Sequence, residues 1–137
     1  MDRSGALIRV SAGSGAGTRA ESGMPARDSM DLNELVASAG DRVGVIWALE
    51  RSGDLNANLV RFDAGGGVGE HVNEEVDVLF VGVAGSGSVC ASGEEHPLGA
   101  GKLVFVPRGT LRSTSALSDG FVYLTVHRRR GPLRIGG

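Results

Sequence analysis

Apolar and polar residues alternate with a period of two through most of the chain after residue 42, which is the pattern of half-buried β-strands. The alternation runs through residues 43–50, stops at the turn-forming residues 51–54, and resumes in residues 55–61, so these two segments are expected to pair as antiparallel strands. Further short apolar runs, separated by Gly, Ser, Asp or Pro, predict strands at residues 68–73, 76–83, 88–91, 103–106, 111–114 and 121–127.

One short helix is expected ahead of the strands. Asp31 is a suitable N-cap, Glu34 follows three residues later as in a capping box, and Gly40 is placed to end the helix. No helical pattern of roughly 10 to 15 residues separates the later strands, which argues against a parallel α/β sheet. The sequence therefore predicts an all-β sandwich or barrel that follows a short N-terminal helix.

The length of 137 residues is that of one domain. Gly, Ser and Ala make up 15 of the first 29 residues, and such a segment buries too little apolar surface to offset its ordering entropy. We expect residues 1–29 to be a flexible or arm-like segment, residues 30–130 to form the barrel, and residues 131–137 to be a C-terminal tail. In the alternative, the apolar stretch at residues 6–10 adds a strand to a neighbouring sheet.

The amino-acid composition argues against nucleic acid and lipid as partners and indicates a cellular location. The 14 basic and 16 acidic residues leave a formal net charge of −2, which gives no general attraction to nucleic acid or to anionic lipid. The single cysteine, Cys90, excludes a disulfide framework within the chain and fits a reducing compartment. No apolar run approaches the roughly 20 residues of a membrane span, so the expected location is the cytoplasm.

The densest polar cluster, residues 69–77, lies between two predicted strands, and in a strand His71 and Asn73 would point to the same side. Around this cluster the chain resembles a small single-domain cupin, in two motifs separated by a hairpin. The positions that match the first motif are Gly65, His71, Asn73, Asp77 and Gly85. The positions that match the second motif are Gly101, Pro107, Gly109, Arg112 and Ala116.

The resemblance implies a cupin double-stranded β-helix, that is, a jelly-roll barrel that is open at one end and often dimeric. It also implies a metal held by three His and one Glu, of which this chain retains only His71. Asn73 offers a metal only a weakly coordinating, neutral oxygen, and Arg112 places a permanent cation where the motif has a histidine. We therefore expect no metal cofactor, with a divalent metal held by His71 and Asp77 as the alternative.

An arginine on the inside of a barrel needs a carboxylate partner or an anionic ligand, because an unpaired buried charge is unfavourable by several kcal/mol. Two interpretations of Arg112 are open at this point. In one, Arg112 binds an anionic ligand, His71 donates or accepts a proton, and Asn73 fixes the orientation. In the other, Arg112 and Asp77 form an internal ion pair that fills the space of the lost metal.

The last predicted strand has two different faces. Phe121, Tyr123, Thr125 and His127 share one face, and the residues between them, at positions 122, 124 and 126, are apolar. The apolar face is the expected inner face, which would leave Tyr123 outside. In the opposite phase Tyr123, Thr125 and His127 lie in the cavity beside His71, and Tyr123 joins the ligand-binding residues.

The predicted function is that of a metal-independent cupin-fold protein that binds a small anionic or carbonyl-bearing organic molecule. Turnover is open; the groups suit proton transfer, isomerisation, cyclisation or decarboxylation in small-molecule biosynthesis. The candidate catalytic residues are His71 and Arg112, and the candidate ligand-binding residues are His71, Asn73, Asp77, Arg112 and Tyr123. The alternatives are a metal-dependent cupin dioxygenase or isomerase and a non-enzymatic sensor or interaction barrel. A homodimer is expected, because exposed sheet edges invite association.

Overall fold

The structure, a computed structural model, describes residues 28–130. The expectations for an added strand at residues 6–10 and for a tail at residues 131–137 lie outside the described residues. The helix and the strands described here belong to the unit that begins at Asp31.

Helix α1 (Leu32–Ala39) is confirmed where the sequence predicts it. The Asp31 carboxylate accepts hydrogen bonds from the N–H groups of Asn33, at 2.9 Å, and Glu34, at 3.2 Å, as an N-cap does. Gly40 ends the helix with a φ of 60°, a conformation that glycine adopts without strain.

The eight predicted strands are all present in residues 28–130, together with one that the alternation did not predict. The strands are β1 (Gly44–Ala48), β2 (Leu55–Phe62), β3 (Gly67–Val72), β4 (Val78–Ala84), β5 (Gly87–Ala91), β6 (Glu94–Pro97), β7 (Leu103–Val106), β8 (Leu111–Ala116) and β9 (Phe121–Arg128). The additional strand is β6, which pairs with β5 and lies at the edge of its sheet. It contains two glutamates and ends in proline, which an edge strand tolerates. It was not predicted because these residues do not alternate between apolar and polar.

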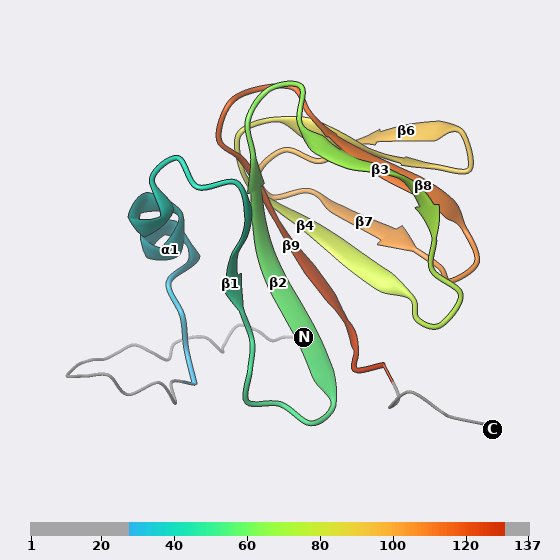
Figure 1. The fold of residues 1–137 in the computed structure, drawn as a ribbon, viewed down its shortest axis with the longest axis horizontal. Coiled ribbons are helices and arrows are strands. Elements are labelled where there is room, and N and C mark those ends of the chain that lie inside the picture. Colours follow the sequence, from blue (N-terminus) through green and yellow to red (C-terminus); the bar gives the residue numbers. More distant parts are fainter. Residues whose placement is uncertain (1–27, 131–137) are drawn as a thin grey trace. The chain divides into compact units, whose positions relative to one another are not determined.

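The strands form two antiparallel sheets that face one another in a jelly-roll arrangement (Figure 1). One sheet has the order β1-β2-β9-β4-β7, and the other has the order β3-β8-β5-β6. Neighbours within each sheet come from distant parts of the chain, as when β9 lies between β2 and β4. The all-β prediction is confirmed.

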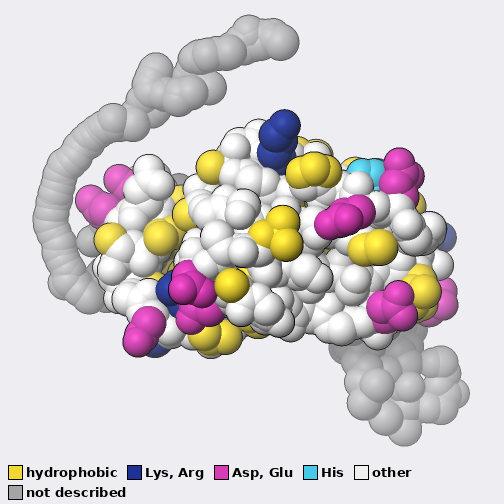
Figure 2. Space-filling view, turned by 90° about the horizontal axis from the view of Figure 1, so that it is seen from above, with side chains coloured by type: hydrophobic (Ala, Val, Ile, Leu, Met, Phe, Trp, Pro, Cys, Tyr) yellow, Lys and Arg dark blue, Asp and Glu magenta, His cyan; other side chains and the backbone are white. Residues whose placement is uncertain are grey.

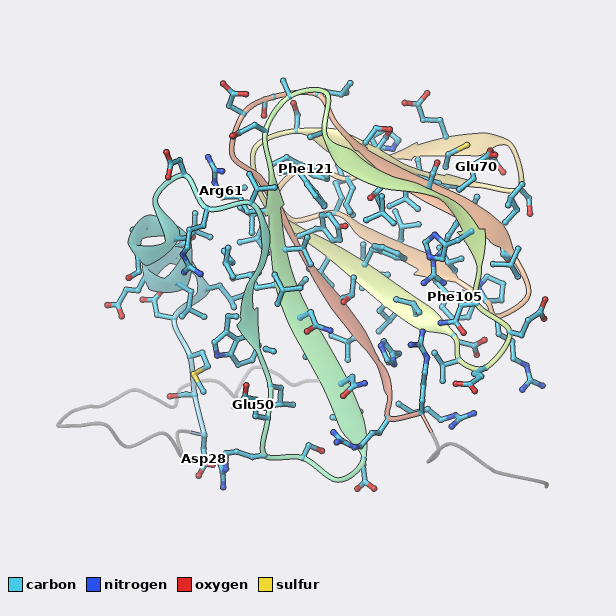
Figure 3. The ribbon with its side chains drawn as sticks, viewed as in Figure 1. Asp28, Glu50, Arg61, Glu70, Phe105 and Phe121 are labelled. Carbon is cyan, nitrogen blue, oxygen red and sulfur yellow. The ribbon has the colours of Figure 1, made fainter. Side chains whose placement is uncertain are left out.

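The inner faces of the two sheets pack on each other through apolar side chains. This core consists of Val60, Val76, Val78, Phe80, Val89, Leu98, Val104, Val106, Ala116, Phe121 and Tyr123. Figure 3 shows Phe121 between the two sheets and Arg61 on the opposite side of β2, toward α1. Burial of such side chains contributes about 1.5–3 kcal/mol each for the larger ones, which makes this core the main source of stability.

The expected phase of β9 is wrong. Phe121 and Tyr123 belong to the core, so the face with Tyr123, Thr125 and His127 is the inner one. The alternate residues of β9 are apolar because the outer face of this sheet is also covered: Val122 and its neighbour Leu59 are both fully buried, outside the core cluster. With both faces covered, hydrophobicity alone does not identify the inner one.

The inner face of the five-stranded sheet changes from apolar to polar along its strands. Directly opposed residues of antiparallel strands share a face, so the register shows which side chains point inward together. From the apolar end to the polar end, the inward pairs of β2 and β9 are Phe62 with Phe121, Val60 with Tyr123, Asn58 with Thr125, and Asn56 with His127. One end of the barrel is therefore filled, and the other end presents hydrogen-bonding groups to the interior.

Candidate functional site

Arg112 is on β8, at the boundary between the apolar and polar parts of the interior. It lies opposite Ala91 of β5 and His71 of β3, and only 9% of its surface is exposed. Its Cζ atom is 5.7 Å from the centroid of the Phe80 ring, within the range of a cation–π interaction. Its Nη1 atom is buried and has no hydrogen-bond partner within residues 28–130.

Tyr123 packs against the same Phe80 ring from β9. The two ring centroids are 5.8 Å apart, and the Phe121 ring is 5.3 Å from Tyr123 on another side. The Tyr123 hydroxyl is 3.3 Å from the Thr114 hydroxyl, which also accepts a hydrogen bond from the Val68 N–H at 3.1 Å. Tyr123 is thus held in one position beside Arg112.

Burial lowers the pKa of Arg112, and the positive charge of Arg130 lowers it further. Arg130 itself is half-exposed, and its Nε atom is 3.5 Å from a carboxylate oxygen of Glu75. Both effects disfavour the charged guanidinium in the ligand-free protein. An anion placed against Arg112 would relieve both of them.

Burial also raises the pKa of Tyr123, against smaller opposing effects of the Thr114 hydrogen bond and of the Arg112 charge. Because the pKa in the folded protein is above the unfolded value near 10, the neutral phenol contributes stability that is fully present below about pH 10. This stability is lost as the pH rises through the folded pKa.

Tyr123 is the only tyrosine in the chain, so absorbance at 295 nm follows this phenol alone. We expect its titration midpoint to be above 10 in the folded protein and near 10 in denaturant. We also expect Tyr123→Phe to remove the corresponding part of the alkaline loss of stability. A folded midpoint at or below the midpoint in denaturant would contradict the buried position of Tyr123.

His71 lies across from Arg112 but is exposed, at the polar end of the interior. Between the pairs Val68–Thr114 and His71–Arg112, β3 has two residues where β8 has one, so a β-bulge precedes the histidine. His71 Nδ1 is 2.9 Å from the carbonyl oxygen of Gly69. A carbonyl only accepts, so Nδ1 carries the proton and Nε2 of the neutral ring has a free lone pair.

Asn73 is buried, and the oxygen and nitrogen atoms of its side-chain amide differ in their hydrogen bonding. The Oδ1 atom accepts hydrogen bonds from the N–H groups of Glu75, at 2.9 Å, and Val76, at 3.3 Å, and so shapes the loop between β3 and β4. The Nδ2 atom is buried without a hydrogen-bond partner among the described residues. Asn73 therefore offers the interior a donor but not an oxygen ligand.

The predicted ion pair between Arg112 and Asp77 is wrong. Asp77 is exposed between the buried Val76 and Val78, so strand alternation turns it away from the interior. Its carboxylate accepts a hydrogen bond from the backbone N–H of Arg108 at 2.9 Å, which stabilises the loop before β8. The structure does not place Asp77 among the residues that face the interior.

The residues at the metal-ligand positions of the cupin motif do not fit a divalent cation. Asn73 has its oxygen occupied by backbone donors, Asp77 faces outward, and Arg112 is itself a cation. Within residues 28–130 no three His, Cys, Asp or Glu side chains gather closely enough to hold a metal ion. The donor set, with His71 as its single imidazole, does not support the predicted alternative of a metal at His71 and Asp77.

Three residues near Arg112 were not singled out from the sequence. Phe80 and Thr114 contact the site directly, and Asn58 faces it from the other sheet, opposite Thr125. The period of two along β8 could have found Thr114, which is two residues from Arg112. The others depend on the pairing of β2, β4 and β9, which no local pattern specifies.

The basic run at the end of β9 contacts neighbouring loops. Arg128 donates to the Glu75 carbonyl oxygen at 2.9 Å, and Arg129 donates to the Ser52 carbonyl oxygen at 3.4 Å. On the face seen in Figure 2, acidic side chains lie between small groups of apolar ones, and few described basic side chains are in view. No helix within residues 28–130 has the length and apolar character to cross a membrane.

Neither a family model nor a curated protein matches the sequence. Solved structures do match it. The structure of KdgF from a Halomonas species is 26% identical, with a TM-score of 0.58, over 62% of this chain and 77% of that one. A cupin-2 domain containing protein from Shewanella frigidimarina is 17% identical, with a TM-score of 0.59, over 73% and 94% of the two chains.

A cupin protein from Bacteroides fragilis is 20% identical, with a TM-score of 0.53, over 66% of this chain and 82% of that one. At such identities the last two likenesses concern the fold alone. Together with the jelly-roll topology and the order of the two motifs, they confirm the resemblance found in the sequence. The chain therefore has the fold of small cupin domains.

Proposed function

We propose that this cupin-type domain binds a small organic anion between its sheets, through Arg112 and without a metal ion. The observation that carries the proposal is the position of the unpaired buried donors. Within residues 28–130, the buried side-chain polar atoms that lack a hydrogen-bond partner are Nη1 of Arg112 and Nδ2 of Asn73. Both residues stand at ligand positions of the cupin motif, and buried donors of this kind normally have a partner.

The surroundings of Arg112 suit a carboxylate, a phosphate or an enolate. The guanidinium can donate two parallel hydrogen bonds to such a group, and it lies on the Phe80 ring rather than against a protein carboxylate. The neutral Tyr123 hydroxyl lies at the same boundary and can donate to a bound anion, whereas the exposed His71 ring offers the lone pair of Nε2 as an acceptor. The anion supplies the negative charge that no carboxylate within residues 28–130 places against Arg112.

The same arrangement supports proton transfer on the bound molecule. With Nδ1 protonated, His71 can accept a proton at Nε2 from a carbon next to the anionic or carbonyl group. Arg112 would then stabilise the enolate that forms. Isomerisation, cyclisation and decarboxylation share this intermediate, whereas a sensor that only binds would leave the carbon–hydrogen bond intact.

Binding is tested by a thermal-shift screen of small carboxylic acids and of divalent metal ions. An acid present at about 100 times its dissociation constant should stabilise the protein by about 2.7 kcal/mol. We expect stabilisation by a subset of acids and none by the metal ions. Stabilisation by a metal ion alone would overturn the proposal in favour of a metal-dependent cupin.

Turnover is tested by incubating a stabilising acid with the protein in D₂O and following its carbon-bound hydrogens by NMR. Exchange that is lost in His71→Gln, with retained binding, is the result expected of an enzyme. Binding without exchange in the unaltered protein would assign the domain to the non-enzymatic sensors.

We also propose that the domain forms a homodimer through the outer face of β4 and β7. Leu79 lies directly opposite Phe105 there, and the outward side chains Leu79, Leu103 and Phe105 are 37%, 60% and 54% exposed. Since β7 is an edge strand, a two-fold axis beside it would bring two such patches together.

Light scattering after size exclusion should give a dimer for the unaltered protein and a monomer for the double variant Leu103→Glu with Phe105→Glu. Leu117→Glu is the matched control, because Leu117 is 65% exposed but lies in the loop after β8. A monomer at about 100 μM for the unaltered protein would contradict this interface.

A further inference from the structure

One inner wall beside Arg112 carries neutral hydrogen-bonding side chains in a row. Asn58 of β2 is directly opposite Thr125 of β9, and Thr125 is opposite Phe80, the residue on which the guanidinium lies. Asn56 and His127 form the next inward pair. Because residues two apart on a strand are about 6.8 Å apart, this polar row extends about 7 Å from Thr125 to His127.

The two pairs of the polar row differ in what they already contact. The pair farther from Arg112, Asn56 and His127, already has hydrogen-bond partners. Asn56 Oδ1 accepts a hydrogen bond from Arg129 at 3.4 Å, and His127 Nδ1 is 2.7 Å from the Arg128 carbonyl oxygen. Neither the Asn58 amide nor the Thr125 hydroxyl has a hydrogen-bond partner within residues 28–130, and both residues are half-buried. The free donors and acceptors are those nearest to Arg112.

The adjoining part of the same sheet is apolar. The inward residues of β4 and β7 near this level are Val78, Phe80, Val104 and Val106, all of them buried. A barrel interior whose only task was packing would continue this apolar surface across β2 and β9, because unpaired amides and hydroxyls are unfavourable there. The polar and apolar parts of this one sheet together match a molecule that is oxygenated along one side and apolar along the other.

We infer that the ligand is a carboxylate that bears hydroxyl groups on its carbon chain, and that Asn58 and Thr125 bind those hydroxyls. The inference rests on the proposed function, since Arg112 holds the carboxylate. Asn58 offers both a donor and an acceptor, and Thr125 offers a hydroxyl, so each can bond to an alcohol in either sense. Asn58 and Thr125 thus set specificity, whereas Arg112 sets the requirement for charge.

The test uses pairs of acids that differ only in their hydroxyl groups: glycolate and acetate, lactate and propionate, gluconate and hexanoate. Calorimetric titration of the full chain should show at least about tenfold tighter binding of the hydroxylated member in one or more pairs. The double variant Asn58→Leu with Thr125→Val keeps the number and branching of the side-chain heavy atoms. It should reduce this preference to within about twofold, while affinity for the deoxy acid is unchanged. Ser115→Ala, on an outward position of β8, is the control and should keep the full preference.

The outcomes separate this inference from the proposed function. Equal affinity for both members of every pair, or a preference that survives in the double variant, overturns the role of Asn58 and Thr125 while leaving binding through Arg112 intact. The same conclusion follows if Arg112→Met loses all binding while the double variant at Asn58 and Thr125 still prefers the hydroxylated acid. Failure of every acid to bind the unaltered protein overturns both.

Discussion

Replacing Arg112 with methionine is expected to raise the stability of the ligand-free protein and to abolish its binding of organic anions. The guanidinium is buried over Phe80, has no carboxylate partner in residues 28–130, and leaves Nη1 without a hydrogen bond. Even exchange of a buried ion pair for apolar side chains of similar volume is often neutral or stabilising by about 1–4 kcal/mol, and Arg112 lacks the partner charge that would offset its desolvation. For a domain of this size, 1 kcal/mol corresponds to a shift of about 4–8 °C in the unfolding temperature.

The measurement is thermal unfolding of both proteins without ligand, followed by calorimetric titration with an acid that binds the unaltered protein. A residue retained for stability would behave in the opposite way. Destabilisation by Arg112→Met of more than about 1 kcal/mol, or unchanged affinity for the acid, would contradict a binding role for this arginine.

Arg61 provides the matched control, because it is the same residue type at the same 9% exposure. Its guanidinium is 3.0 Å from the Asp63 carboxylate and donates to the Arg42 carbonyl oxygen at 3.2 Å. Loss of these contacts in Arg61→Met should destabilise the protein by about 1–3 kcal/mol. Opposite signs for the two substitutions distinguish a paired structural arginine from one that awaits a ligand.

Gly82→Ala is expected to prevent stable folding. A Cβ atom at position 82 would lie 1.9 Å from the carbonyl oxygen of Gly99 and 2.9 Å from that of Leu98, both of them backbone atoms that no side-chain rotation can move. Overpacking inside a domain is unfavourable by about 1–3 kcal/mol when side chains can adjust, and this contact leaves no such adjustment. We expect a loss of about 3 kcal/mol or more, or failure to accumulate folded protein.

Gly69→Ala is the control for this substitution, since a Cβ atom there meets nothing within 4 Å. Its stability should stay within about 0.5 kcal/mol of the unaltered protein, as for ordinary surface substitutions. Chemical denaturation of the three proteins provides the comparison. Equal stability of the two alanine variants would mean that β4 does not pass so closely beneath the segment before β7.

Local physical rules explain why much of the fold can be predicted from the sequence. The N-cap at Asp31 and the glycine at position 40 fix the ends of α1, and alternation within each strand depends only on neighbours in the chain. Strand β6 is the exception, because its residues are polar and it owes its extended form to pairing with β5. The sequence therefore predicts elements well wherever one strand carries its own apolar face.

The candidate site depends on contacts that the sequence does not encode locally. His71 and Arg112 could be placed from the motif, and the structure does bring them opposite one another. Asp77 points outward because it lies between the buried Val76 and Val78. The inward position of Tyr123 could not be predicted, because residues on both faces of β9 are buried. The neutral pair of Asn58 and Thr125 comes together only because β9 is inserted between β2 and β4.

The central claim is that the charge of Arg112 is complemented by the charge of a bound molecule. A thermodynamic cycle measures this directly: the unaltered protein and Arg112→Met are each titrated with one carboxylic acid and with the corresponding neutral amide. A coupling of at least about 1.5 kcal/mol between the guanidinium and the carboxylate, as for a charged hydrogen bond, is the predicted result. Equal losses of affinity for acid and amide would contradict the claim, because Arg112 would then act on the ligand without sensing its charge.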